Sequence, residues 1–323
     1  MSFYKNKKVV VTGAAGLLGV HLVSDLLAAG ASVRAVVHKR SLYIEDPRVE
    51  IVQADLTQEL DCDRVMAGMD IACLCASVTV GAAQAIKNPM LAVTSNLIMA
   101  ARQLQAACLA KVGQVLLISS TTIYPAYTRP VKEDEAFLEE PHPAYQGVAN
   151  MKRYVEKLAQ FYHDQYDMSI AIVRPVPFYG RYDNFDFETC HVIPALIRKA
   201  VEKQDPFEVW GTGNDIRDFL HVKDVARGCL LALERYPECD GLNLGSGEGV
   251  SIAQIAQTIT SLAEHNAPIV FAASKPSTIP FRLVDINKAQ EKIGFKAEIS
   301  LEEGLLDTIG WFASNRQQIL SGQ

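Results

Sequence analysis

A short segment near the N-terminus, Val9–Gly19, constrains the fold of this chain more than any other part of the sequence. Three valines and a threonine are followed by glycines at every third position, which are Gly13, Gly16 and Gly19. This order is typical of a strand, a tight turn and a helix, because glycine lets the backbone turn sharply and approach a phosphate closely. The N–H groups and the positive dipole end at the start of the helix can then hold a pyrophosphate. We therefore predict dinucleotide binding here, with an ordinary connection between strand and helix as the alternative.

The composition of the chain limits its class. At 323 residues, 49% of them hydrophobic, it is long enough for two domains or one large α/β domain. Its formal net charge of −6 gives no overall attraction to nucleic acid or to an anionic membrane, and it has no apolar run of about 18 residues that could span a bilayer. The N-terminus has no signal-peptide pattern, so we expect a cytoplasmic protein. The seven cysteines form no C-x-x-C pair, which favours free thiols over a metal site.

Strand-like and helix-like segments alternate through the first half of the chain. We predict strands at 32–37, 49–53, 70–75, 114–119 and 169–173, and helices at 20–29, 90–108 and 144–166. This alternation predicts right-handed βαβ units and hence a Rossmann-type, doubly wound parallel sheet of the α/β class, with its ligands at the carboxyl edge. In the second half we predict a strand-like run at 217–222 and helices that start near residues 191 and 224 or span 252–264 and 301–313. We place a cofactor-binding domain at 1–174 and a smaller α/β substrate-binding domain at 175–323, some of whose segments return to the first.

The residues after the second and third predicted strands bear on the choice of cofactor. His38, Lys39 and Arg40 stand where an acidic side chain would hold the ribose 2′-OH of NAD, whereas cations suit the 2′-phosphate of NADP. We therefore favour NADP over NAD, with a solvated basic loop as the alternative. Asp55, which precedes Leu56, either meets the adenine edge or caps the helix that follows.

Several motifs together are similar to a known family. The glycine spacing, Ser120 four residues before Tyr124, and Tyr145 at the head of a helix resemble the extended short-chain dehydrogenase/reductases, which mostly act on nucleotide sugars. More specific segments of the second half resemble the GDP-L-fucose synthase family: Tyr179–Phe185, His191–Lys199, Val209–Gly213, Arg217–Val222 and Glu298–Leu305. The similarity runs from about residue 7 to residue 313. That family epimerises C3 and C5 of GDP-4-keto-6-deoxymannose and then reduces C4 with NADPH.

The resemblance implies roles for a few side chains at the reacting sugar. Tyr145 would give a proton to the C4 oxygen and Ser120 would share that oxygen, although the two could also be a packing aromatic and a strand-end cap. His191 matches the family's acid/base histidine, and an imidazole with an ordinary pKa of about 6.5 suits that work; a histidine bound to backbone at a helix start is the alternative. The family's cysteine falls on Thr122, a far poorer proton carrier than a thiol. Cys190 adjoins His191 in the sequence, which does not by itself place it at the sugar.

One position departs from the family pattern. The family's Tyr-x-x-x-Lys motif places both side chains on one helix face, where the lysine holds the nicotinamide ribose and lowers the pKa of the tyrosine. Counted from Tyr145, that lysine falls on Ala149, while Lys152 lies one turn further on a similar face, about 4.5 Å along the axis. Three explanations stay open: Lys152 or an arginine substitutes, the cofactor is held differently, or the chain is an inactive variant.

In the second half the resemblance implies a nucleotide-sugar site. Lys199, Arg217 and Arg282 would reach the diphosphate or the nucleotide, which suits cations physically, with plain surface charge as the alternative. Trp210 would pack near the guanine or ribose, and Asn184 would border the sugar. The expected cofactor contacts are Gly13, Ala15, Gly16, Leu17, Leu18, His38, Lys39, Arg40, Asp55, Leu56, Ala76, Tyr145 and Pro175.

The residues and the resemblance together predict an NADP-dependent epimerase or reductase that acts on a GDP-4-keto-6-deoxyhexose or a related GDP-sugar. Two alternatives remain. One is an NDP-sugar 4-epimerase that uses bound NAD, and the other is a catalytically impaired relative that binds NADP or a nucleotide sugar. The helices at 90–108 and 144–166 predict a homodimer, because the family often dimerises through two helices of each subunit.

Overall fold

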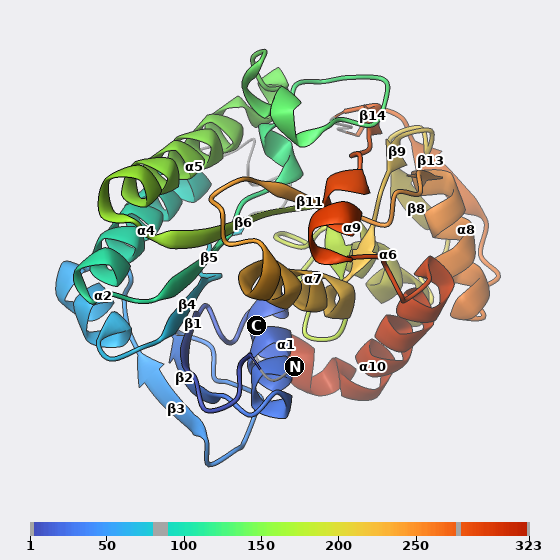
Figure 1. The fold of residues 1–323 in the computed structure, drawn as a ribbon. Coiled ribbons are helices and arrows are strands. Elements are labelled where there is room, and N and C mark those ends of the chain that lie inside the picture. The colour runs from blue at the N-terminus through green and yellow to red at the C-terminus, as the bar shows by residue number, and fades with distance from the viewer. Residues whose placement is uncertain (1–2, 80–89, 276–278, 322–323) are drawn as a thin grey trace.

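A parallel seven-stranded sheet forms the centre of the computed structural model, which describes residues 3–79, 90–275 and 279–321 (Figure 1). The strand order is β11-β6-β5-β4-β1-β2-β3. The strands are β1 (Lys8–Thr12), β2 (Ser32–Val37), β3 (Val49–Gln53), β4 (Ile71–Leu74), β5 (Gln114–Ile118), β6 (Ser169–Pro175) and β11 (Leu242–Leu244). The Rossmann-type, doubly wound α/β fold predicted from the sequence is thereby confirmed.

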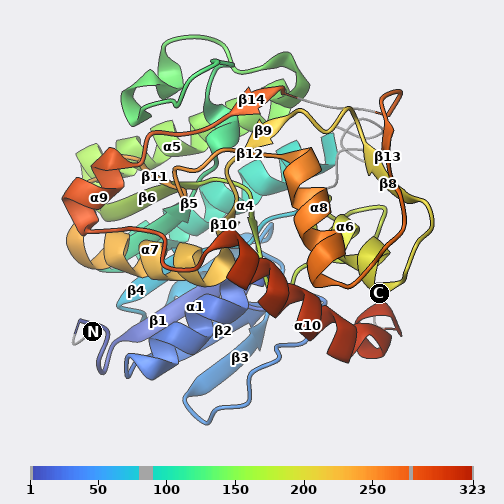
Figure 2. The same ribbon diagram turned by 90° about the vertical axis from the view of Figure 1, so that its right-hand side faces the viewer.

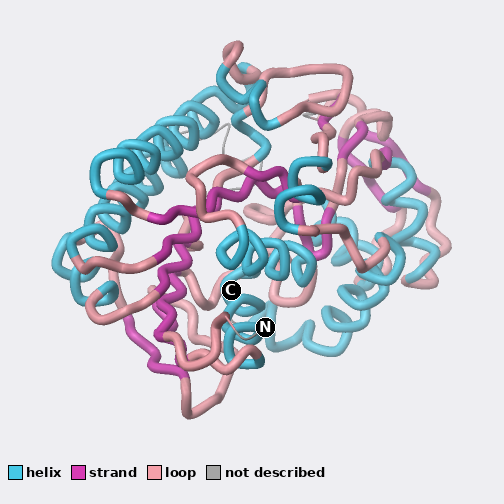
Figure 3. Tube along the Cα trace, viewed as in Figure 1, coloured by secondary structure: helices cyan, strands magenta, loops and turns pink. Residues whose placement is uncertain are grey.

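Helices bury both faces of this sheet (Figures 1 and 3). One face carries α1 (Leu17–Ala28) and α7 (Val222–Arg235), and the other carries α2 (Glu59–Met66), α4 (Met90–Leu109) and α5 (Gln146–Tyr166). Alternate side chains of β1 enter the two apolar layers, since Val9 and Val11 belong to one buried cluster and Val10 to the other. Because such strands are buried on both faces, their sequences are continuous apolar runs rather than alternating patterns.

The strand order reverses between β1 and β4, and the glycine segment lies at this reversal. β1 pairs with β2 on one side and with β4 on the other. The chain therefore adds β2 and β3 on one side of β1, and then adds β4 and the strands after it on the opposite side. Ligands of open α/β sheets bind in the crevice at such a reversal, beyond the carboxyl ends of the strands. The fold therefore places Gly13 and the start of α1 at the expected ligand position.

The second half of the chain contributes a smaller lobe with its own apolar core (Figure 2). Its short strands pair as β7 (Phe178–Tyr179) with β10 (Leu220–His221), β8 (Phe207–Trp210) with β13 (Ile269–Ala272), and β9 (Ile216–Arg217) between β12 (Val250–Ser251) and β14 (Phe281–Arg282). The helices of this half besides α7 are α6 (Val192–Val201), α8 (Ile252–Leu262), α9 (Asn287–Ile293) and α10 (Leu301–Ser321). The helices expected near 191, 252 and 301 are thus present, and none of the described helices is long and apolar enough to cross a membrane.

Two elements of the second half belong to the large sheet and not to the smaller lobe. β11 pairs with β6, so that Leu242 lies opposite Val173. α7 packs against α1 and β6, on the face of the sheet that α1 covers (Figure 1). The large sheet therefore includes residues from beyond the division expected at residue 174, and that division stays a prediction.

Two helices begin at positions that bear on the site. α1 begins at Leu17, ahead of the predicted start at residue 20, because the glycines let its first turn pack closely on the end of β1. A Cβ atom at Gly19 would lie 2.2 Å from the carbonyl oxygen of Gly13, so only glycine permits this approach. α5 begins at Gln146 and not at 144, and Tyr145 is its N-cap at the end of a short 3-10 turn.

The run at 217–222, predicted as one strand, is divided between β9 and β10. Between them lies the buried Asp218, whose carboxylate accepts hydrogen bonds from the backbone N–H groups of Ser246 (3.1 Å) and Gly247 (3.0 Å). This contact turns the chain out of the first strand. α7 then begins directly at Val222, slightly ahead of the expected start at residue 224.

Candidate active site

The glycine segment forms a cradle at the carboxyl end of β1. Gly13 has a left-handed φ of 66°, and a Cβ on it would lie 2.8 Å from the Cα of Ala76, which follows β4. Thr12 ties the two strand ends together, because its hydroxyl oxygen accepts hydrogen bonds from the N–H groups of Cys75 (3.1 Å) and Ala76 (3.2 Å). Within the described residues, no side chain caps α1 and no acidic residue lies in its first turn. These features fit the pyrophosphate of a dinucleotide.

Other predicted cofactor contacts lie along the same edge of the sheet. Ala15 belongs to the glycine turn, and Leu17 and Leu18 open α1. Pro175 ends β6 at the corresponding edge. Leu56 follows β3 and is buried in the apolar layer beneath α2 and α4. The carboxyl ends of the strands therefore gather these residues, as a doubly wound sheet requires.

The adenosine side of the predicted cofactor site is more open. His38, Lys39 and Arg40 are exposed and follow β2 directly, where a 2′-phosphate can reach them. Asp55 accepts hydrogen bonds from the backbone N–H (3.0 Å) and the hydroxyl (2.7 Å) of Thr57. These contacts form a tight turn before α2, whose N-cap is Gln58 without a side-chain hydrogen bond, so the helix cap considered for Asp55 is not present.

Ser120 and Thr122 lie where β5 ends and a short 3-10 helix, Thr121–Ile123, begins. Ser120 is the N-cap of this turn, and its hydroxyl oxygen accepts a hydrogen bond from the N–H of Thr122 at 3.1 Å. The hydroxyl of Thr122 is buried and has no hydrogen-bond partner among the described residues. Ser120 is thus a cap at the end of a strand, which was the alternative role considered for it. The hydroxyls of Ser120 and Thr122 both lie at the sheet edge that carries the glycine cradle.

A lysine of α5 reaches this sheet edge, and it is Lys152. Its Nζ donates a hydrogen bond of 2.8 Å to the carbonyl oxygen of Ile118, the last residue of β5. Burial lowers the pKa of Lys152 to about 8, while the charge of Glu156 opposes that shift. Ala149, at the position counted from Tyr145, is fully buried. We expect this placement if Lys152 takes the role of the lysine in the Tyr-x-x-x-Lys motif from a position three residues further along α5.

Tyr145 lies against Arg282 from the second half of the chain, and Arg217 is the cross-strand neighbour of Arg282. The Cζ of Arg282 is 4.6 Å from the centre of the Tyr145 ring, and Arg217 stands opposite Arg282 in the pairing of β9 with β14. Burial lowers the pKa of Arg282 to about 10, with Tyr145 opposing this shift and the charge of Arg217 adding to it. The Nη2 of Arg282 is buried without a hydrogen-bond partner in the described part of the chain. Arg217 donates to the carbonyl oxygen of Ile216 at 2.8 Å and lies 3.8 Å from the carboxylate of Asp215. Neighbouring buried cations repel each other unless an anion joins them.

The remaining predicted substrate residues lie on α6, on β8 and in the loop before α6. The Nζ of Lys199 donates to the carbonyl oxygen of Glu208 at 2.7 Å, and burial lowers the pKa of Lys199. Trp210 ends β8 with 43% of its surface exposed, which leaves an indole face for stacking. Asn184 donates from its amide to the hydroxyl of Thr189 at 2.7 Å and so shapes the loop.

His191 is the N-cap of α6, and Cys190 precedes it. The His191 residue is exposed, yet the protein packed around its ring displaces solvent and lowers the pKa of the imidazole. The imidazole is therefore neutral at neutral pH and can accept a proton. Burial raises the pKa of Cys190 to about 12, so this thiol stays protonated and is a poor base.

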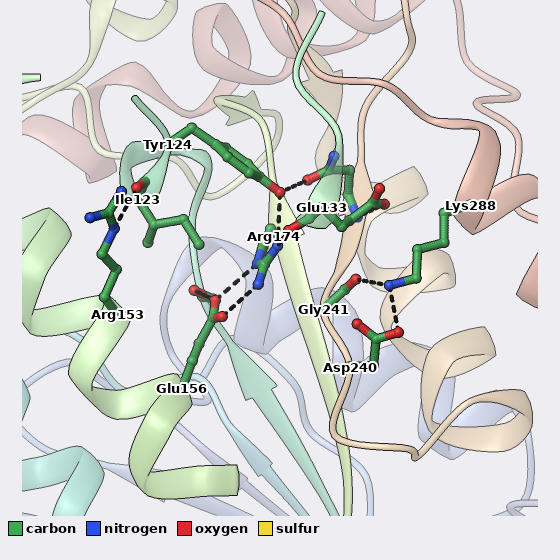
Figure 4. Close-up of polar contacts among 11 residues, drawn as sticks. Ile123, Tyr124, Glu133, Arg153, Glu156, Arg174, Asp240, Gly241 and Lys288 are labelled. Atoms are coloured by element: carbon green, nitrogen blue, oxygen red, sulfur yellow. Dashed lines mark hydrogen bonds and ion pairs between the residues drawn. The ribbon is translucent and has the colours of Figure 1, made fainter. Parts of the chain in front are cut away.

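A buried polar network that the sequence did not predict lies beside the end of β5 (Figure 4). Arg174 on β6 and Glu156 on α5 form an ion pair, with both side chains only 5% exposed. Arg174 also donates to the hydroxyl of Tyr124 at 2.9 Å, and Tyr124 donates to the amide oxygen of Asn243 on β11 at 2.6 Å. The sequence contains one signal for this network. Glu156 follows Lys152 by one helical turn, so two charged side chains lie on a face of α5 that is otherwise apolar.

The fold and the site together define a class of protein. A doubly wound sheet with a glycine cradle at its reversal point is the architecture of a dinucleotide-dependent enzyme. Among residues 3–79, 90–275 and 279–321, no cluster of His, Cys, Asp or Glu suits a metal ion. Residues 9–245 match the model of the NAD dependent epimerase/dehydratase family. The chain belongs to this family of NAD(P)-dependent enzymes, within the short-chain dehydrogenase/reductases.

Named relatives match nearly the whole chain. A probable GDP-L-fucose synthase 1 of Oryza sativa subsp. japonica is 31% identical over 316 residues, which are 96% of this chain and 93% of the rice protein. A dTDP-4-dehydro-6-deoxy-D-allose reductase of a Streptomyces species is 29% identical over 97% of this chain and 98% of its own. The solved UDP-glucose 4-epimerase of Thermotoga maritima with UDP-glucose has a TM-score of 0.87 at 22% identity, over 96% of this chain and 99% of its own, and so shares the fold. The similarity to the GDP-L-fucose synthase family is thereby confirmed.

Proposed function

We propose that the chain is an NADP-dependent epimerase or reductase that acts on a GDP-4-keto-6-deoxyhexose or a related GDP-sugar. The observation that carries this proposal is the cross-strand pair of Arg217 and Arg282 against Tyr145. Two half-buried arginines at paired positions of neighbouring strands suit a diphosphate, and the contact of Arg282 with Tyr145 brings that anion next to a phenol that can exchange a proton. The name of the rice relative supports guanine as the base.

Each side chain has a distinct part in the proposed reaction. The chemistry that the cofactor supplies when bound is hydride transfer at C4 of the sugar. Tyr145 gives a proton to the C4 oxygen, or takes it in reverse, and Ser120 donates a hydrogen bond to the same oxygen. Lys152 offers its remaining N–H donors to the nicotinamide ribose.

His191 is the proposed acid/base at C3 or C5. Its imidazole has a pKa lowered by the surrounding protein and is neutral at neutral pH, so it can remove a proton next to a ketone. Thr122 stands at the family's cysteine position and carries a hydroxyl, which exchanges protons poorly. We therefore propose proton exchange at one carbon in place of two.

Solvent deuterium tests this function. With GDP-4-keto-6-deoxymannose and NADPH in heavy water, the enzyme should oxidise NADPH and incorporate deuterium next to the ketone, as followed by absorbance and NMR. His191→Asn should slow deuterium incorporation by about a hundredfold or more, while NADPH binding stays unchanged. A protein that binds NADPH but neither oxidises it nor exchanges deuterium would instead be a catalytically impaired relative.

A 4-epimerase that keeps NAD bound is the second candidate. The Streptomyces relative is named for a dTDP-sugar, which leaves the base open, and a 4-epimerase needs no proton exchange at C3 and C5, which suits Thr122. Mass spectrometry of the nucleotide released from denatured enzyme separates the two candidates. Tightly held NAD, together with tighter calorimetric binding of UDP or dTDP than of GDP, would replace the first proposal by the second.

We also propose a homodimer built on α4 and α5, which pack side by side. Large apolar side chains are exposed on both helices: Ile98, Leu109, Tyr154, Phe161 and Tyr166. Apolar surface on neighbouring helices is typical of an interface. Sedimentation velocity should show a dimer, and a monomer at micromolar concentration would contradict the proposal.

A further inference from the structure

Two charged side chains of α5 hold consecutive residues at the end of β5. Lys152 and Glu156 lie one helical turn apart on the same face. The Nζ of Lys152 donates to the carbonyl oxygen of Ile118 at 2.8 Å, and the carboxylate of Glu156 accepts a short hydrogen bond from the hydroxyl of Ser119. The next residue is Ser120, so these two contacts fix where the Ser120 hydroxyl stands relative to α5.

The carboxylate of Glu156 is itself held in place by Arg174 (Figure 4). Its two oxygens accept hydrogen bonds from Nε at 3.1 Å and from Nη2 at 2.7 Å. Arg174 is anchored in turn by the carbonyl oxygen of Glu133 at 2.8 Å and the hydroxyl of Tyr124 at 2.9 Å. Glu156 therefore cannot rotate away from Ser119 without breaking a buried ion pair.

Glu156 is also the main negative charge that acts on Lys152. Burial lowers the pKa of Lys152 to about 8, and the groups that oppose this shift are Glu156 on α5 and then Cys75 after β4. Burial raises the pKa of Cys75 to about 12, so its thiol is neutral at physiological pH and adds no charge there. Arg174 on β6 offsets part of the charge of Glu156. Glu156 thus favours the cationic form of the half-buried Lys152.

We propose that Glu156 is a positioning residue of the active site, which aims Ser120 through Ser119 and supplies the negative charge that balances Lys152. This inference rests on the role proposed above for Lys152 at the cofactor. It adds that Glu156 sets the charge state of Lys152. Glu156 itself contacts Ser119 and Arg174 and does not touch the reacting groups.

The test is the pH dependence of NADPH affinity in the full-length enzyme. Fluorescence titrations across a pH range centred on the Lys152 pKa of about 8 should show affinity falling as the pH rises through that value, because the ammonium loses its proton. In Glu156→Gln the same fall should occur about one pH unit lower or more, since the balancing charge is gone. In Lys152→Met the fall should be absent.

The possible outcomes separate this inference from the proposed function. A fall at the wild-type pH in Glu156→Gln would show that Glu156 has only a structural role and overturn the inference. A fall that persists in Lys152→Met would show that Lys152 does not bind the cofactor, which overturns the role proposed for Lys152 and the inference with it.

A matched control and a second variant keep the test decisive. Glu133→Gln alters another buried carboxylate of the same network, one that accepts from the N–H of Asn243 at 2.9 Å, and should leave the pH of the fall unchanged. If Glu156→Gln does not fold, Glu156→Gln combined with Arg174→Met leaves no unpaired buried charge. That double variant should also shift the fall to lower pH, by less than Glu156→Gln alone because the positive charge of Arg174 is lost as well, and an unshifted fall would again overturn the inference.

Discussion

Replacing Lys152 by methionine should lower kcat by about a hundredfold or more, the lower end of what a positioned proton-transfer group contributes. Methionine keeps an unbranched stem but removes the ammonium that lies 2.8 Å from the carbonyl oxygen of Ile118. Without that cation the nicotinamide ribose loses a donor in the proposed complex. NADPH oxidation at saturating sugar and cofactor measures the change.

Two further variants show whether the effect belongs to this position. Lys157→Met removes an exposed lysine of the same helix and should leave kcat unchanged. Ala149→Lys combined with Lys152→Met should not restore turnover, because position 149 is fully buried and a lysine there would overpack its surroundings. Restored turnover in that double variant would show that the functional position is 149 after all.

The pH dependence of turnover has a definite sign. Lys152 is cationic below its pKa of about 8, so turnover should hold below that pH and fall as the pH rises through it. Lys152→Met should lack this alkaline fall, because no group at that position then titrates. An alkaline fall of equal size in the variant would assign the titration to another residue.

Arg174→Met should cost about 3–5 kcal/mol of unfolding free energy, the largest stability effect that we expect from one substitution in this chain. The variant leaves the carboxylate of Glu156 without its cation at a site that is only 5% exposed. It also leaves the hydroxyl of Tyr124 and the carbonyl oxygen of Glu133 without a donor. Urea unfolding followed by circular dichroism measures the loss.

The control for this effect is an ion pair at the surface. Arg102 and Glu59 pair with 38% and 56% of their side chains exposed, so Arg102→Met should cost less than about 1 kcal/mol. Adding Glu156→Gln to Arg174→Met should recover part of the lost stability, because no unpaired charge remains buried. Equal losses in the single and double variants would show that the cost comes from packing rather than from the unpaired charge.

The large sheet could be predicted from the sequence because its signals are local. The valines before Gly13 and the glycines after them define a strand, a turn and a helix within one short segment. The alternation of apolar strands with amphipathic helices then leads to a parallel sheet by general rules of chain connection. Local signals also located the ends of β4 and β5, where Ala76 and Ser120 stand.

The lysine that reaches the end of β5 could not be identified from the sequence, because spacing along a helix does not show where the helix begins or how it packs. Counting from Tyr145 leads to Ala149. In the structure Tyr145 precedes the first turn of α5, and the side chain that reaches β5 is Lys152. Packing of α5 on the sheet decided which residue faces the strand end.

The arginine pair and the buried network also depend on information that local patterns lack. Arg217 and Arg282 meet because β9 and β14 pair in one particular register, and these strands are far apart in the sequence. Glu156 and Arg174 meet because α5 and β6 pack together after a connection that reverses the chain. Such contacts follow from tertiary packing, which a single sequence without related sequences does not reveal.

The pairing of β11 with β6 has a consequence for how the protein is made. A ribosome delivers residues in order, so the strands from β1 to β6 leave it before α7 and β11 do. Until then β6 has an open edge and the face of the sheet beside α1 lacks its second helix. The large sheet therefore stays incomplete until the chain has been synthesised through β11, and until then the open edge of β6 can pair with another strand.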